Sequence, residues 1–176
     1  MGLLVFGIGP ATVSAFVVIR KLLNDNLDVS IWKLFKQTFK KDFWNANKLM
    51  LVIFPVCFFI YLDFLFLQML PSSFFMDKIV FTSMIILSLL IIIWFSYLFA
   101  VYVHVDLQFK ENFKYALLIA GINPLPTTFI LIGLFVFLIL LLIVPAISIF
   151  YLISVPIFII QLCADQAFKK ISRAPV

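Results

Sequence analysis

The side chains that could perform chemistry in this sequence are few and far apart. His104 is the single histidine, with no second histidine or cysteine near it, so the spacing provides no zinc site. Cys57 and Cys163 lie in separate apolar segments without a CxxC spacing, which indicates small buried hydrophobic side chains. No glycine-rich phosphate loop, HExxH or GxSxG motif is present. We therefore expect no catalytic residue, metal or cofactor, and no enzyme activity.

Asp63 is the charge that the sequence places deepest in an apolar stretch. A charge inside a bilayer is costly and commonly marks a transport path or a contact with another helix. Asp63 is thus a candidate intramembrane polar residue, and the alternative is that its carboxylate reaches the outer surface. Asp165 lies where the last apolar stretch ends. Polar groups are otherwise so sparse in these stretches that we do not expect a complete sugar or ion pathway in one chain.

The composition indicates a membrane protein. Hydrophobic residues make up 65% of the 176 residues and charged residues 12%, against about half and about a quarter in ordinary soluble domains. Lipid covers apolar surface that a core of this size cannot hide. The net charge of +5 comes from basic residues beside apolar stretches, so we expect an anionic membrane face as the partner and no nucleic acid.

Five stretches are long and apolar enough to cross about 30 Å of hydrocarbon. They cover residues 2–23, 49–70, 79–105, 125–144 and 147–164. The last two form one apolar run, which must fold back near Pro145 because a single helix of that length would be about twice the bilayer thickness. The expected fold is all-α, a polytopic helical membrane protein with one integral membrane domain over residues 1–176.

The basic residues predict the orientation. All but Lys78 of the 13 Lys and Arg residues lie in the two longer loops or at the C-terminus. The positive-inside rule places these segments in the cytoplasm. Five spans with a cytoplasmic C-terminus put Met1 outside the cell, or require a preceding segment.

Two amphipathic helices are predicted in the cytoplasmic loops, at residues 30–45 and 107–120. In the first, Phe35, Phe39 and Phe43 recur every fourth residue, with Lys36 and Lys40 on the other side. A helix of this kind lies in the headgroup layer. It is a candidate docking surface for the membrane or for a partner protein, and a simple interfacial anchor is the alternative.

The second amphipathic helix places Phe109 and Phe113 beside Lys110 and Lys114, and Gly121 with the prolines that follow predicts its end. A short cytoplasmic helix, a glycine turn and a proline-initiated span loosely resemble the coupling-helix loop of ABC importer permeases, although the acidic-Ala-Ala opening of those loops is absent. That resemblance implies docking into a groove of an ATPase subunit.

Two further features concern the packing of the helices and a possible duplication of the sequence. Gly7, Gly9 and Pro10 interrupt the first span, and small residues there permit close approach of another helix. Residues 35–40 and 109–114 match each other, each after a span and before another. A parallel duplication, as several transporters use, explains the match, and a chance similarity is the alternative.

Gly9-Pro10-Ala11-Thr12, the following Arg20-Lys21 and the two amphipathic segments resemble the YesL-like family of bacterial membrane proteins. Members are commonly encoded beside carbohydrate ABC importers and glycoside hydrolases, mainly in Gram-positive bacteria, and the resemblance implies no catalytic residue. Members usually have some tens of residues before the Gly-Pro-Ala-Thr stretch, so we expect a truncated first span here.

These expectations combine into one leading hypothesis. It is a non-catalytic accessory subunit in the bacterial cell membrane, bound to the permease or ATPase subunits of a carbohydrate ABC importer. One alternative is a small transporter or channel formed by homo-oligomers, for which Asp63 is the best evidence. Another is a membrane-bound regulator whose basic helix binds anionic lipid.

Overall fold

The computed structural model confirms the all-α fold. It describes residues 2–24, 30–69, 74–105, 107–144 and 151–173, and that part of the chain contains no strand. Its helices are α1 (Gly2–Leu23), α2 (Ile31–Lys41), α3 (Phe43–Met69), α4 (Phe74–His104), α5 (Phe109–Ile122), α6 (Pro124–Ile143) and α8 (Ser154–Arg173).

Four of these helices are long and apolar enough to cross a membrane. The qualifying segments are Phe6–Leu23, Phe43–Phe66, Lys78–His104 and Pro124–Ile143. The predicted fifth span, 147–164, begins in residues 145–150, which lie outside the described part. The helix that follows, α8, runs on to Arg173 and carries Asp165, Lys169 and Lys170 in its second half. The described chain is a multi-pass membrane protein by the length and composition of these four helices.

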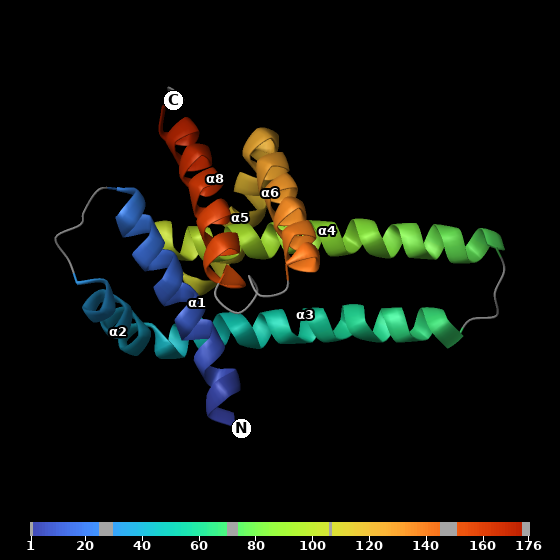
Figure 1. Cartoon of the computed structure of the whole chain (residues 1–176), viewed down its shortest axis with the longest axis horizontal. Coiled ribbons are helices and arrows are strands. Elements are labelled where there is room, and N and C mark those ends of the chain that lie inside the picture. The colour runs from blue at the N-terminus through green and yellow to red at the C-terminus, as the bar shows by residue number, and fades with distance from the viewer. Residues whose placement is uncertain (1, 25–29, 70–73, 106, 145–150, 174–176) are drawn as a thin grey trace.

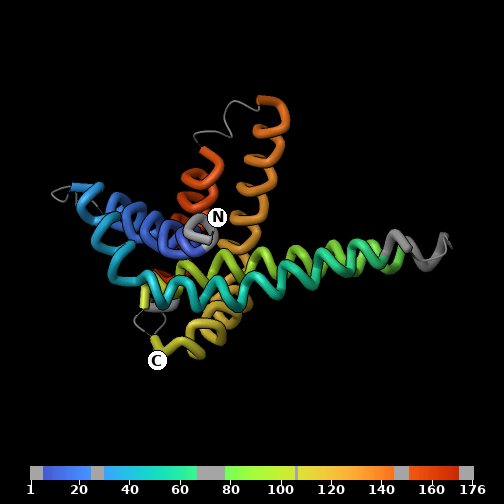
Figure 2. The backbone as a smooth tube through the Cα atoms, turned by 90° about the horizontal axis from the view of Figure 1, so that it is seen from below, coloured from blue at the N-terminus to red at the C-terminus, as the bar shows by residue number. Residues whose placement is uncertain are grey.

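Helices α3 and α4 run antiparallel along the longest axis of the molecule, as Figure 1 shows. Helix α1 crosses both helices of this pair near one end, whereas α6 and α8 pack against α4 and extend away from α3 (Figures 1 and 2). The two short helices, α2 and α5, pack against the long helices that precede them, α1 and α4. The predicted order of span, short helix and span therefore occurs twice along the chain.

The buried core lies where the helices cross. Its largest fully buried side chains include Tyr97, Phe16, Leu49 and Ile130, contributed by α4, α1, α3 and α6. The ring of Phe16 stacks on Phe99 with centroids 5.8 Å apart. Away from the crossing, α3 and α4 have only each other as neighbours among the described elements. Large apolar side chains are exposed there, and a bilayer would cover them.

Gly9 permits a close contact between α1 and the start of α3. It is buried, and a Cβ at this position would lie 2.9 Å from Cγ of Met50 and 3.0 Å from the backbone oxygen of Ala46. Gly7, one of its predicted partners in packing, would have nothing within 4 Å of its Cβ. A similar approach joins α6 to α8, because a Cβ at Gly133 would meet Ile159 at 2.8 Å. Small residues thus set two of the helix crossings.

The first amphipathic helix is shorter than predicted. It ends at Lys41, the chain bends at Asp42, and α3 begins at Phe43 and not at residue 49. The backbone N–H of Ala46 donates to the Asp42 carbonyl at 2.8 Å, so helical bonding resumes at once. The four-residue aromatic repeat continues through the bend, which is why periodicity could not reveal it.

The end of α5 also differs from the prediction. Gly121 lies inside the helix, and Asn123 is the C-cap. The Asn123 side chain donates to the carbonyl of Ile119 at 3.2 Å, which satisfies an oxygen that a helix end leaves open. Pro124 then starts α6 as expected, because its missing N–H is not needed at the first helical position.

Candidate functional site

Arg20 and Lys21 of α1 and the lysines of α2 and α5 lie at the end of the molecule where the helices cross. The C-terminal ends of α1 and α4 meet α2, the start of α3 and the start of α5 there (Figure 1). We call this region the basic end. It contains all the docking candidates that the sequence predicted on α2 and α5, so its geometry decides what those candidates can do.

A continuous row of rings runs along α2 and around the bend into α3. Trp32 stacks on Phe35, Phe35 on Phe39, Phe39 contacts Phe43, and Phe43 meets Trp44 edge-on, with centroid distances of 5.9–6.3 Å. We call these five residues the aromatic ladder. Its ends are exposed, Trp32 by 74% and Trp44 by 77%, while its three phenylalanines are half-buried. Lys36 and Lys40 are exposed, so α2 is amphipathic as predicted.

Helix α5 is held firmly against α4 by its first two turns. Phe109 and Phe113 meet edge-on at 5.2 Å, and Phe113 lies 5.8 Å from the ring of Trp94. The indole N–H of Trp94 donates to the Phe113 carbonyl at 3.2 Å. Lys110 and Lys114 are exposed. Phe109 and Phe113 therefore hold α5 against α4, while Lys110 and Lys114 face outward.

The turn from α5 to α6 is fixed by one threonine. The hydroxyl of Thr127 bonds the Asn123 carbonyl at 2.8 Å and lies 3.1 Å from the hydroxyl of Tyr97 on α4. It also lies 3.2 Å from the Ala120 carbonyl. Tyr97 is completely buried, so this network sits in the core and leaves little freedom to the turn.

The outward side of α5 is apolar. Leu117, Leu118 and Ile122 are 64%, 47% and 59% exposed, opposite the buried Asn112, Ala116 and Ile119. Leu125 at the start of α6 continues this surface and is 64% exposed. We call Leu117, Leu118, Ile122 and Leu125 the α5 face. An apolar face on a fixed helix at a basic end suits contact with lipid or with another protein.

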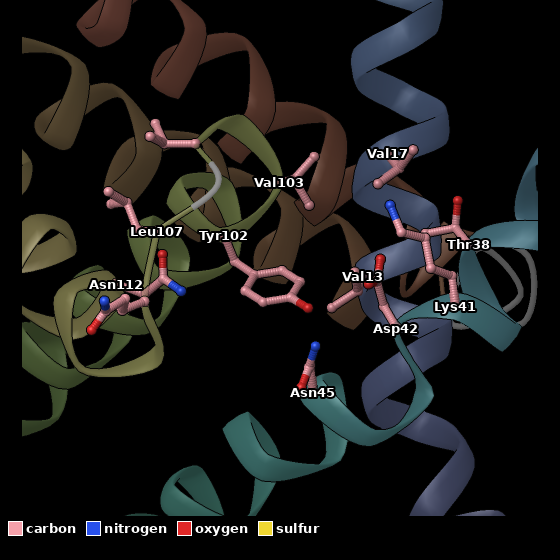
Figure 3. A pocket seen from close by; sticks show the side chains of 12 residues that line it. Val13, Val17, Thr38, Lys41, Asp42, Asn45, Tyr102, Val103, Leu107 and Asn112 are labelled. Carbon is pink, nitrogen blue, oxygen red and sulfur yellow. The ribbon is translucent and has the colours of Figure 1, made fainter.

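A cleft of about 620 Å³ opens where α1, α2, α3, α4 and α5 meet. We call it the polar cleft. Its polar lining consists of Thr38, Lys41, Asp42, Asn45, Tyr102, Gln108 and Asn112, and its apolar lining of Val13, Val17, Val103, Val105 and Leu107. Figure 3 shows Tyr102 between Thr38, Lys41 and Asp42 on one side and Leu107 and Asn112 on the other. Cavities of about 300–1,000 Å³ are typical of small-molecule sites.

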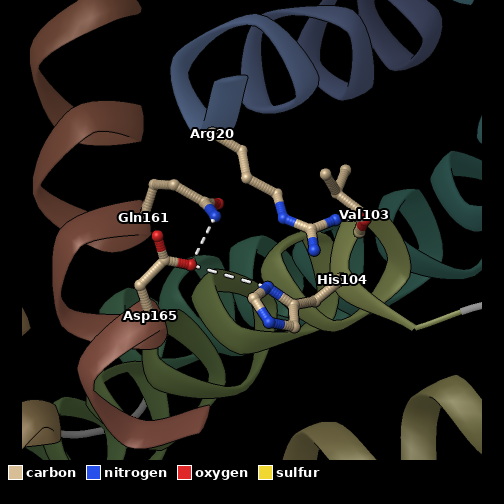
Figure 4. A network of polar contacts seen from close by, with 5 residues as sticks. All are labelled: Arg20, Val103, His104, Gln161 and Asp165. Carbon is tan, nitrogen blue, oxygen red and sulfur yellow. Dashed lines mark hydrogen bonds and ion pairs between the residues drawn. The ribbon is translucent and has the colours of Figure 1, made fainter. Parts of the chain in front are cut away.

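A second polar cluster joins α1, α4 and α8 (Figure 4). Gln161 donates through Nε2 to Oδ1 of Asp165 at 3.0 Å, and Nδ1 of His104 lies 3.5 Å from the same oxygen. Arg20 donates to the carbonyl of Val103 at 2.5 Å. We call Arg20, His104, Gln161 and Asp165 the polar junction. It connects the C-terminal ends of α1 and α4 to the middle of α8.

The α8 side of the polar junction is buried, whereas Arg20 and His104 are partly exposed. Gln161 is fully buried and Asp165 is 8% exposed, while the His104 ring stacks on Phe168 at 4.0 Å. The His104–Asp165 contact is an ion pair only when the imidazole is protonated; it does not meet hydrogen-bond geometry, and Nδ1 of His104 has no hydrogen-bond partner. None of these four side chains lines the polar cleft. The imidazole of His104 and the carboxylate of Asp165 therefore bring the end of α4 to α8.

Asp63 and the two cysteines lie elsewhere. Asp63 is exposed on the second half of α3, and no described residue forms a hydrogen bond or an ion pair with it. Cys57 is also exposed on α3, because that half of the helix has only α4 beside it, so its predicted burial is wrong for the chain alone. Cys163 is half-buried and free. In the described part of the chain, no group of three or more His, Cys, Asp or Glu side chains could hold a metal ion.

The comparisons with known proteins identify the family. Residues 1–64 match the family model "Protein of unknown function, DUF624". The uncharacterized protein YesV of Bacillus subtilis (strain 168) is 32% identical over 151 residues, which cover 86% of this chain and 72% of YesV. This chain belongs to the DUF624 family. The resemblance to the YesL-like family is thereby confirmed.

Two further relatives are members of the same family from the same organism. YesL is 28% identical over 133 residues, and YteU is 33% identical over 120 residues. The matches cover 61% of YesL and 53% of YteU, so this chain spans about half to three-quarters of the length of these relatives. All three carry the name uncharacterized protein. No solved structure matches the chain.

Proposed function

We propose that this DUF624 protein is a non-catalytic accessory subunit of a carbohydrate ABC importer in a bacterial cell membrane, with its basic end and C-terminus in the cytoplasm. The observation that supports this most is the α5 face, an exposed apolar surface on a short fixed helix at the basic end. The resemblance of the sequence to the YesL-like family supplies the kind of partner. Charge placement supplies the orientation.

The way α5 is held supports a docking role. A helix that transmits force to or from a partner must keep its position when the partner pushes on it, and a fixed helix loses less entropy on binding. Trp94 and Phe113 fix the first half of α5, and Thr127 fixes its end. The side chains of the α5 face therefore lie on a helix that is already ordered before a partner binds.

The contacts of the internal polar groups support a role in binding a partner protein. Tyr97 and Thr127 bond each other between α4 and α6, and Gln161 donates to Asp165 within α8. The first pair joins α4 to α6, and the second places the Asp165 carboxylate beside His104 of α4. Helices α3 and α4 are long enough to cross a membrane, and their exposed apolar side chains would be covered by a bilayer or by a permease helix.

Replacing Leu118 with glutamate should release the partner. A charge placed in the buried part of a protein interface must lose its water, so we expect recovery of the importer subunits to fall by about tenfold or more. The test is purification of the tagged protein from its native membrane in mild detergent, followed by mass spectrometry of the proteins that accompany it.

Leu22→Glu is the matched control, because Leu22 is an exposed leucine at the basic end on α1 and not on the α5 face. Its partner recovery should equal that of the unaltered protein. If no permease or ATPase subunit accompanies the unaltered protein, the proposal of an importer partner is wrong. If Leu118→Glu retains all of the partner, the α5 face is not the docking surface.

A homo-oligomeric transporter or channel is the second candidate, and Asp63 favours it. A carboxylate at a lipid-facing position costs about 2.5–3.5 kcal/mol in the middle of a spanning helix. Asp63 lies two turns from the end of α3 and has no hydrogen bond or ion pair in the described chain. A neighbouring copy could surround it with polar groups and create a path for a solute.

Asp63→Asn separates this candidate from the first. If copies of the chain form a path, the purified protein in liposomes should pass sugar or cations without ATP, and Asp63→Asn should reduce the flux to the background of empty liposomes. Thr82→Val, which removes an exposed hydroxyl from the outer half of α4, should leave the flux unchanged. Absence of flux from the unaltered protein rejects the candidate.

A further inference from the structure

We propose that the polar cleft is a binding site for a neutral, hydroxyl-rich group. The chemistry is that of a soluble oligosaccharide or of the headgroup of a neutral glycolipid. Such binding depends only on the residues that line the cleft, so it does not require an importer partner. The cleft is separate from the α5 face and from the polar junction, with which it shares only the backbone neighbour Val103.

The functional groups of the lining match hydroxyls. Asn45, Gln108 and Asn112 each present a carboxamide, which carries both a donor N–H₂ and an acceptor oxygen. Thr38 adds a hydroxyl that is also donor and acceptor. A ligand hydroxyl needs both kinds of partner at once, whereas an ion needs only one kind. A lining made mainly of carboxamides and hydroxyls is therefore suited to a polyol.

Asn112 shows that this lining is incomplete. It is 2% exposed, and its Oδ1 has no hydrogen-bond partner. A buried acceptor without a donor costs about 1–3 kcal/mol, so such an atom points to a missing partner. A hydroxyl of a bound ligand supplies the donor and recovers part of that cost.

The charges of the cleft argue against an anionic ligand. Lys41 is the single cation of the lining, and Asp42 beside it brings an equal negative charge. Phosphate sites commonly gather several Arg or Lys side chains or a row of backbone N–H groups. The other lysines of α2, Lys33, Lys36 and Lys40, do not line the cleft. The basic end attracts anions in general, while the cleft itself is balanced.

The shape and position of the cleft suit an extended ligand at a membrane surface. Thr38 and Asn112 come from opposite sides of the cleft, and Tyr102 lies between them (Figure 3). A sugar ring has an apolar face that packs on an aromatic ring. Amphipathic α2 forms one wall, and a helix of this kind lies where headgroups and water meet. A soluble sugar and a glycolipid headgroup both have access there.

The test uses the full chain with two kinds of probe. In detergent, thermal unfolding is followed with increasing sucrose or maltose and, in parallel, with glycerol 3-phosphate. In phosphatidylcholine nanodiscs with or without diglucosyldiacylglycerol, native mass spectrometry measures the lipid that stays bound. Saturable binding of a disaccharide identifies a soluble ligand, and selective retention of the glycolipid identifies a headgroup. Either result supports the proposal.

Asn45 provides the decisive variant, because it is exposed and can be replaced without disturbing the core. We expect Asn45→Ala to weaken binding by about three- to tenfold, the loss of one or two hydrogen bonds. Asn47→Ala is the control on the same helix, since Asn47 does not line the cleft, and its affinity should stay within about twofold. The proposal is overturned if neither neutral probe binds, if glycerol 3-phosphate binds more tightly than both, or if the two variants behave alike.

Discussion

Replacing Gly9 with leucine is expected to destabilise the fold by about 3 kcal/mol, the upper part of the range for overpacked sites. Gly9 is buried where α1 crosses the start of α3, and even a single Cβ would stand 3.0 Å from the Ala46 carbonyl oxygen. That oxygen belongs to a helix backbone and cannot rotate away as a side chain can. The whole of α1 would have to move.

The consequences of that movement spread beyond α1. Phe16 and Val13 of the same helix belong to the buried core, and Val13 also lines the polar cleft. Arg20 at the end of α1 donates to the Val103 carbonyl. We therefore expect Gly9→Leu to lower the midpoint of chemical unfolding in detergent and to increase proteolysis of the protein at the same time.

Gly7→Leu is the matched control on the same helix. A Cβ at Gly7 has nothing within 4 Å, so the added side chain extends away from the packed surface. Leucine also favours a helix over glycine by about 0.5–1 kcal/mol, and Gly7→Leu should be neutral or stabilising. Equal destabilisation by the two substitutions would show that flexibility of the glycines, and not close packing of Gly9, is what matters.

The apolar repeat of α2 predicts one feature of the structure and misses another. The spacing of Phe35, Phe39 and Phe43 predicted a ring-bearing face, and the rings do contact each other along it. The same spacing could not show the bend at Asp42, because the repeat passes through the bend without a change of phase. Periodicity reports which side of a helix is apolar, but it does not report a break in the helix axis.

The contacts between distant segments could not be predicted from the sequence. His104 and Asp165 are 61 residues apart, and their sequence positions indicated only that both lie near the ends of apolar stretches. The polar cleft combines side chains from α1, α2, α3, α4 and α5, none of which forms a motif alone. Such sites depend on how helices cross, and a single sequence contains no direct record of that.

The family and the helical class were accessible from the sequence for a different reason. Membrane insertion is decided locally, by about 20 apolar residues at a time, so each span could be recognised without its neighbours. The exact end of a helix was harder to predict, as Asn123 shows. Glycine is the usual residue at a helix end, yet here the side chain of Asn123 bonds the Ile119 carbonyl and ends α5 after Gly121.

Asp165→Leu is expected to cost about 2 kcal/mol, because it leaves the Nε2 donor of Gln161 buried without an acceptor. Oε1 of Gln161 already has no partner. Asp165→Asn keeps an acceptor oxygen and removes the charge beside His104, so it should cost less. The two variants thus separate the hydrogen bond of Gln161 from the effect of the negative charge of Asp165.

The double variant Gln161→Leu/Asp165→Leu should be more stable than Asp165→Leu alone. Removing both partners leaves neither position with an orphaned polar group, and two leucines of similar volume fill the space with apolar atoms. We expect its unfolding free energy in detergent to lie within about 1 kcal/mol of that of the unaltered protein, a coupling of the kind that neighbouring sites show. Strictly additive losses would instead mean that Gln161 and Asp165 stabilise the junction separately, Asp165 through His104 and Gln161 through its packing among α1, α4 and α8.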